Sequence, residues 1–122
     1  MMWFSLAAAL SAVWLGVHLV LGGKDIAAPL LRADGLVPVV RDTQYLCWHF
    51  TSCAIAAMAV GFAYAAWSGD IALAWGVTLL AAAFAVTGIG LVIRIGQSHR
   101  KLPQGWLFVP VATFGAIGLF QV

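Results

Sequence analysis

Apolar residues fill four long stretches of the chain, and polar residues are gathered between them. The stretches cover residues 3–22, 43–67, 71–95 and 103–121. An α-helix rises 1.5 Å per residue, so about 20 apolar residues cross the hydrocarbon core of a bilayer. The pattern therefore predicts an all-α integral membrane protein, with a bundle of four transmembrane helices in a single membrane domain over residues 1–122.

Residues 24–42 form the one long connection in this pattern. Short apolar pieces alternate there with charged residues. Pro29 and Pro38 interrupt a continuous helix, because proline lacks a backbone N–H and clashes with the preceding turn. We expect a longer cytoplasmic loop that lies along the membrane surface or caps the bundle. Pro38 also fits the first turn of a second helix that begins early.

The most polar stretch leads directly into the second apolar segment. Residues three, four and seven apart share one face of a helix. This spacing gives a stripe of Asp42, Tyr45, His49 and Ser52, with Cys53 beside it. Such a stripe is costly inside a membrane unless it faces protein, water or a ligand.

Three helices are expected to bring polar residues to one layer near the same membrane surface. On the first helix, Ser11, Trp14 and His18 share a face. His18 lies near the end of that helix, and His49 lies near the start of the next one, at a similar depth. Arg94, near the end of the third helix, lies at or just outside this level.

Composition and charge set the environment. The chain is 64% hydrophobic and 8% charged, whereas soluble domains carry about a quarter charged residues. Its net charge of +2 is too small to indicate a nucleic-acid partner. All basic residues fall on one side of the expected bundle: Lys24, Arg32, Arg41, Arg94, Arg100 and Lys101. By the positive-inside rule we expect the loop over residues 24–42 and the turn over residues 96–102 to be cytoplasmic and both termini to lie on the outer side, with the lipid bilayer as the main partner.

The polar layer offers ligands for a transition metal. His49 and Cys53 are spaced i and i+4 on one helix, and His18 would approach from the neighbouring helix. Imidazole and thiolate suit zinc or copper, with Asp42 orienting a histidine. Because Cys47 and Cys53 point about 120° apart on a helix, we expect free thiols rather than a disulfide.

Haem b is the other cofactor candidate. His18 and His49 would serve as axial ligands inside the bundle. Tyr45 lies on the same stripe, and Arg94 would pair with the propionate groups near the cytoplasmic surface.

Two function classes without a cofactor remain open. In the first, His18, His49, Asp42 and Arg94 form a polar entrance or proton relay in a small oligomeric transporter. In the second, the two histidines hydrogen-bond with each other or with neighbouring hydroxyl groups, and fix the helices of an accessory or structural subunit. The chain has no nucleophile elbow, phosphate-binding glycine loop or pair of carboxylates, so no enzymatic activity is indicated.

Small residues recur along the third helix. One stripe consists of Thr78, Ala81, Ala85 and Gly88, and another of Ala83, Thr87, Gly90 and Arg94. Small side chains let helix backbones approach closely in lipid. We therefore expect a homo-oligomer or a place in a larger membrane complex.

Short motifs in the first half of the chain form a recurring arrangement. His18 is followed by Gly22, then by Pro29-Leu30-Leu31, then by Trp48-His49-x-Thr51-Ser52. This arrangement resembles small four-span inner-membrane proteins of bacteria, from which no established activity carries over. The resemblance implies that His18, Pro29 and His49 form a unit, with the connecting loop over the histidines.

Overall fold

The computed structural model describes residues 1–121, which are helical apart from short turns. In chain order the helical segments are α1 (Met2–Val17), η1 (His18–Ala27), α2 (Ala28–Leu31), α3 (Pro38–Ser68), α4 (Ile71–Arg94) and α5 (Gln104–Phe120). The first three are continuous and form one rod. Residues 1–121 thus fold into four helices without a strand, which confirms the all-α prediction.

The first rod runs well past the helix end that was predicted at Gly22. Its middle part, η1, is a π-helix, in which a backbone N–H bonds to the carbonyl five residues back. The N–H of Ala28 bonds to the Gly23 carbonyl in this way. Pro29 then falls in the first turn of α2, where hydrogen bonding returns to the α pattern and an N–H is not needed. The proline therefore does not break the rod.

The predicted loop over residues 24–42 is wrong, because only residues 32–37 lie between the helices here. α3 begins at Pro38, the alternative that the sequence allowed. Its first turn forms at once, since the N–H groups of Val40 and Arg41 bond to the Val37 carbonyl at 2.9 and 3.1 Å. Most charged residues of this region therefore lie on helices rather than in a loop.

A short turn joins α3 to α4. Gly69 has a φ of +75°, in the left-handed region that side chains disfavour. Asp70 then caps α4, because its carboxylate accepts a hydrogen bond from the backbone N–H of Leu73 at 2.9 Å. The chain reverses here within two residues.

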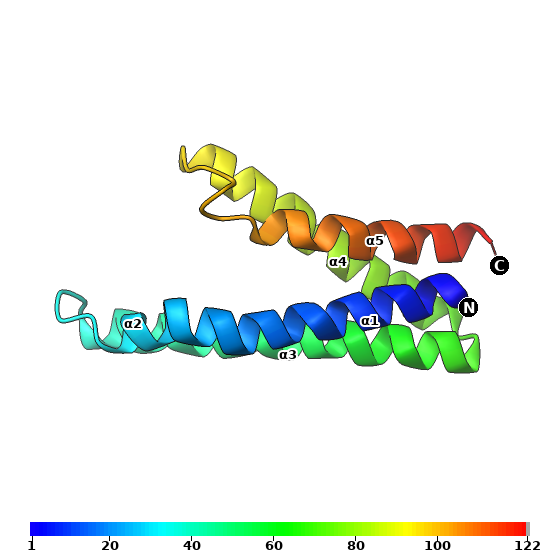
Figure 1. Ribbon diagram of the computed structural model, residues 1–122, viewed down its shortest axis with the longest axis horizontal. Helices are drawn as coiled ribbons and strands as arrows, with labels where there is room; N and C mark the ends of the chain where they lie inside the picture. Colours follow the sequence, from blue (N-terminus) through cyan, green and yellow to red (C-terminus); the bar gives the residue numbers. More distant parts are fainter. Residues whose placement is uncertain (122) are drawn as a thin grey trace.

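The helices form two antiparallel pairs, α1 with α3 and α4 with α5 (Figure 1). The pairs meet near the two termini and diverge toward the other end, where the α2–α3 and α4–α5 connections lie (Figure 1). We call this second end the diverging end. Where the pairs meet, buried side chains from all four helices form the core; the largest that are fully buried are Phe4, Met58, Phe62 and Val111.

Small residues set the distances between helices in this core. Gly118 lies against Phe4, and Gly115 lies against Thr78, with no room for a Cβ atom at either glycine. The predicted small-residue stripe from Thr78 to Gly88 is used inside the chain, where its glycine meets Gly105 of α5. The stripe therefore explains the α4–α5 contact and gives no support of its own to an oligomer.

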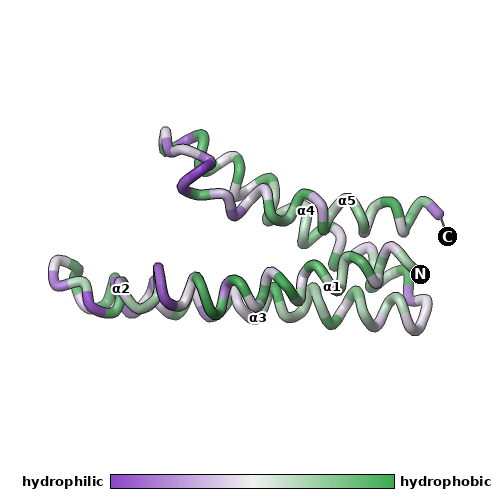
Figure 2. The backbone as a smooth tube through the Cα atoms, in the orientation of Figure 1, coloured by the Kyte–Doolittle hydropathy of each residue, from purple (hydrophilic) through white to green (hydrophobic). Residues whose placement is uncertain are grey.

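The outer surface is that of a membrane protein. Three helices, Met2–Leu31, Pro38–Ser68 and Ile71–Arg94, are long and apolar enough to cross a bilayer, while α5 has 17 residues and is shorter. Large apolar side chains face outward, among them Trp67 (82% exposed) and Val86 (72% exposed). Such a surface suits lipid rather than water. Hydrophilic residues gather at the diverging end (Figure 2).

Candidate functional site

His18 links the first rod to α3 through hydrogen bonds. Its Nε2 lies 3.0 Å from Ser52 Oγ and 3.3 Å from the carbonyl oxygen of Trp48. The Ser52 hydroxyl donates to that same carbonyl at 3.1 Å. With this hydroxyl proton engaged, we assign the His18 proton to Nε2, which donates to Ser52 Oγ. The contact joins His18 to two positions of α3 that lie one turn apart.

An aromatic cluster surrounds this junction. The His18 ring stacks on Trp48 with centroids 4.5 Å apart and planes 19° apart. Tyr45 lies parallel to Trp48 at 6.3 Å. A Cβ atom at Gly22 would lie 3.8 Å from Trp48 Nε1 and 3.9 Å from His18 Nδ1, so the rod also covers these rings closely. His18 is the first residue of η1, and π-helical segments frequently occur at functional sites.

Two residues of the predicted stripe, Asp42 and His49, form no hydrogen bond with His18 within residues 1–121. His49 is exposed, and its ring meets Tyr45 (4.6 Å) and Trp48 (5.0 Å) of its own helix edge-on. Asp42 is exposed and pairs with Arg41 at 2.8 Å. Ser52 is buried and Tyr45 is half-buried, so the stripe divides between these two residues and the exposed Asp42 and His49.

The candidate cofactor ligands are dispersed. Within residues 1–121, no three side chains of histidine, cysteine, aspartate or glutamate lie close enough together to hold a metal ion. Cys47 and Cys53 are exposed free thiols, as predicted. Arg94 is exposed at the end of α4. For haem, His18 already uses Nε2 in the Ser52 contact and His49 does not line the cavity described next, so the two histidines are not placed as a facing axial pair.

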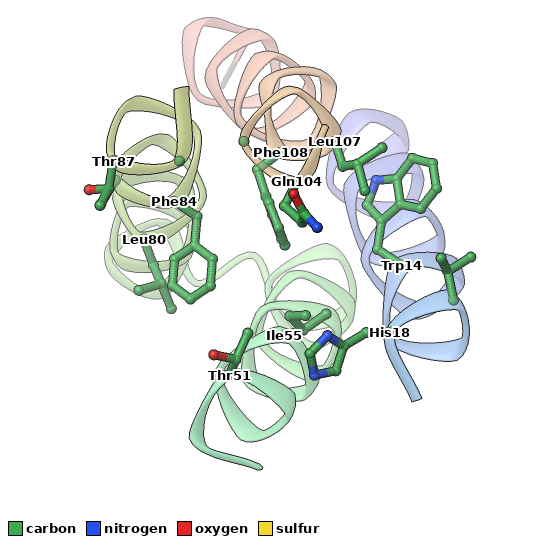
Figure 3. Close-up of a pocket in the computed structure, with 14 residues that line it drawn as sticks. Trp14, His18, Thr51, Ile55, Leu80, Phe84, Thr87, Gln104, Leu107 and Phe108 are labelled. Atoms are coloured by element: carbon green, nitrogen blue, oxygen red, sulfur yellow. The ribbon is translucent and has the colours of Figure 1, made fainter. Parts of the chain in front are cut away.

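A cavity of about 420 Å³ lies between the two helix pairs, next to the core on the side of the diverging end. The first rod and the helices α3, α4 and α5 all contribute to it (Figure 3). The walls are formed by Trp14, Val17, His18, Thr51, Ile55, Leu80, Ala83, Phe84, Thr87, Gly88, Gln104, Gly105, Leu107 and Phe108. Phe84 and Phe108 meet at 5.1 Å between their ring centroids, on the α4–α5 side. The lining is almost wholly apolar.

Few polar atoms reach the cavity wall. His18 and Gln104 lie on opposite sides of it, on the first rod and on α5 (Figure 3). Trp14 also lines it, and its buried indole N–H has no hydrogen-bond partner among the described residues. The cavity can hold an apolar molecule by van der Waals contact with its lining, with at most a few hydrogen bonds.

No protein-family description matches the chain, and comparison with curated proteins and with solved structures likewise finds no significant match. The geometry alone therefore carries the functional argument.

Sequence patterns identified one wall of the cavity and missed the others. The face of Ser11, Trp14 and His18 does point inward, with Ser11 buried and the other two residues at the cavity. Phe84 and Phe108 carried no distinguishing signal, because an aromatic residue in an apolar stretch is as easily lipid-facing as cavity-lining. Only the divergence of the two pairs brings these residues to one space.

Proposed function

We propose that the protein is a small accessory membrane protein that holds an apolar, bilayer-derived molecule in the cavity between its two helix pairs. The single observation that carries this proposal is the apolar cavity of about 420 Å³, formed where the pairs diverge. Ligand sites typically measure about 300–1,000 Å³ and are lined mainly by apolar and aromatic side chains with few polar groups. This cavity has both properties.

Binding accounts for the cavity better than conduction does. On the side of the termini, the helices pack around Phe4, Phe62 and Val111, which are fully buried. A pathway for ions would require polar groups along this part of the bundle. Apart from the buried hydroxyl groups of Ser11 and Thr78, this core is apolar, and it closes one end of the cavity.

The proposed setting is a bacterial-type inner membrane, with the diverging end at the cytoplasmic surface and both termini outside. All six basic residues lie in residues 24–41 and 94–101, the two segments at the diverging end. This distribution supports the orientation by the positive-inside rule. The cavity would then open within the cytoplasmic leaflet.

Native mass spectrometry of the protein, released from its own membrane in mild detergent, tests the proposal. We expect one retained molecule of defined mass per chain. Ala83 is exposed at the cavity wall, so Ala83→Phe narrows the cavity and should lower the retained fraction several-fold. An absorption spectrum of the same sample would reveal a haem.

The matched control is Ala72→Phe. Ala72 is exposed on the same helix and lines no cavity wall, so this substitution adds an equal bulk elsewhere. Retention should remain at the level of the unmodified protein. A chain released without any bound molecule, or equal losses in the two variants, would overturn the proposal.

A further inference from the structure

The two helix pairs differ in charge at the diverging end. Residues 24–42 contain three basic and three acidic residues, which balance. Residues 71–121 contain three basic residues and no acidic one. These are Arg94, Arg100 and Lys101, and we call them the basic turn. Its positive charge is therefore uncompensated within its own helix pair.

Salt bridges do not distinguish the two helix pairs, because Lys24 and Arg32 of the first pair are also exposed and form none within residues 1–121. Arg41 and Asp42, on the first pair, form the only salt bridge among the described residues. The members of the basic turn are all exposed, and none of them forms a salt bridge within residues 1–121. Their charged groups are free to meet an external anion.

The basic turn directly follows the α4–α5 wall of the cavity. Arg94 lies seven residues after Thr87, which is two helical turns or about 10 Å along α4 and nearly the same face. Lys101 precedes Gln104 by three residues, and Gln104 lines the cavity at the start of α5. Along α4 the apolar cavity therefore comes first and the basic turn follows it. A lipid has the same order, from its acyl chain to its headgroup.

We propose that the molecule in the cavity is an anionic phospholipid, with an acyl chain between the helix pairs and its phosphate headgroup at the basic turn. This inference rests on the proposed function and specifies its ligand. Arginine and lysine are the side chains that recognise phosphate, arginine through two parallel N–H bonds. A zwitterionic lipid would bring a second positive charge to a site that is already cationic.

Membrane orientation alone does not explain the charge distribution. The positive-inside rule counts basic residues and is insensitive to acidic ones, so it applies equally to both connections. Only the basic turn lacks acidic residues, and it borders the cavity wall formed by α4 and α5. Charge complementarity at this place selects an anionic headgroup.

The test uses the full chain in nanodiscs of phosphatidylcholine that contain a trace of photoreactive lipid. The two probes are phosphatidylglycerol and phosphatidylcholine with the same diazirine-bearing acyl chain. After irradiation, peptide mass spectrometry measures labelling at the cavity residues Phe84 and Leu107 relative to the lipid-facing Ile93. We expect the phosphatidylglycerol probe to label the cavity residues preferentially, and this preference to fall as salt is raised.

Neutralising variants locate the headgroup. Basic residues near a membrane surface attract anionic lipids, so Arg100→Gln with Lys101→Gln should lower the preference for phosphatidylglycerol several-fold. The matched control, Lys24→Gln with Arg32→Gln, neutralises two exposed basic residues of the other connection and should leave it unchanged.

The outcomes separate the two proposals. Equal cavity labelling by both probes, or equal losses in both double variants, would overturn the headgroup inference and leave the proposed function standing. Labelling of Ile93 alone by both probes would overturn the proposed function itself. The salt series on the unmodified chain does not depend on any variant folding.

Discussion

Gly88 of α4 and Gly105 of α5 bring the backbones of these helices into direct contact. A Cβ atom at Gly88 would lie 2.7 Å from the Cα atom of Gly105, and one at Gly105 would lie 2.5 Å from the backbone nitrogen of Ile89. Both glycines line the cavity. The contact therefore fixes one wall of the binding site as well as the pairing of the two helices.

We expect Gly105→Ala to destabilise the protein. The added methyl group meets backbone atoms, which cannot move aside as a flexible side chain would. Overpacking of this kind typically costs about 1–3 kcal/mol. Unfolding in mixed micelles of mild detergent and sodium dodecyl sulfate measures the change in the free energy of unfolding.

Gly90→Ala is the control for this substitution. Gly90 is exposed on α4 and has no atom within 4 Å of a Cβ position, so alanine should be neutral or slightly stabilising there. If the two variants lose equal stability, the close approach of α4 and α5 is not what Gly105 provides.

The hydrogen bond between His18 and Ser52 should couple the first rod to α3 energetically. His18→Phe keeps an aromatic ring for stacking on Trp48 but removes the nitrogen that lies 3.0 Å from Ser52 Oγ. A double-mutant cycle with Ser52→Ala should give a coupling of about 0.6 kcal/mol, the usual size inside membrane proteins. The same unfolding assay measures each corner of the cycle.

The exposed histidine supplies the comparison. His49→Phe preserves the edge-on contacts with Tyr45 and Trp48, and within residues 1–121 His49 forms no hydrogen bond with Ser52. Its cycle with Ser52→Ala should show no coupling. A coupling as large as that of His18 would mean that the cycle reports a general change in α3.

The helical class of the fold could be predicted from the apolar stretches, because a run of that length has one stable arrangement in a bilayer. The connection over residues 24–42 could not. Its two prolines were interpreted as interruptions, with a first-turn position left open for Pro38 alone, yet Pro29 lies in the first turn of α2 and Pro38 opens α3. Proline is tolerated in a first turn, and sequence alone did not show that both prolines occupy one.

The sequence predicted the part of the site on the first helix and missed the part on α3. Helical spacing correctly placed Ser11, Trp14 and His18 on an inward face. It could not give the rotation of α3, which exposes His49 and buries Ser52 three residues later. The absolute rotation of a helix depends on the neighbours it packs against, and the partner residue Trp48 carried no polar pattern to reveal it.

Cysteine accessibility tests the proposed orientation. In a Cys47→Ser, Cys53→Ser background, Ser68→Cys and Ser98→Cys place single thiols at exposed positions on opposite ends of α4. A membrane-impermeant maleimide should label residue 68 in intact cells and residue 98 only after permeabilisation. The positive-inside rule predicts this order, since position 98 lies in the basic turn region. The reverse order of labelling would invert the orientation.

Thr78 offers a stabilising substitution. It is 6% exposed in the core, and its hydroxyl oxygen has no hydrogen-bond partner among the described residues. A buried polar group without a partner costs about 1–3 kcal/mol. Valine has a similar shape and no polar atom to satisfy, so we expect Thr78→Val to raise the free energy of unfolding by about 1 kcal/mol, the lower end of that range.

The contact with Gly115 keeps the expected gain at this lower end, because the hydroxyl oxygen lies against that glycine and a methyl group there is slightly larger. The control is Thr113→Val, at an exposed threonine whose hydroxyl donates to the Val109 carbonyl at 2.8 Å. Removing a satisfied bond on a lipid-facing surface should change stability little. A loss of stability in Thr78→Val, with none in Thr113→Val, would contradict the prediction and would mean that the contact with Gly115 or a hydrogen bond of the Thr78 hydroxyl outweighs the gain.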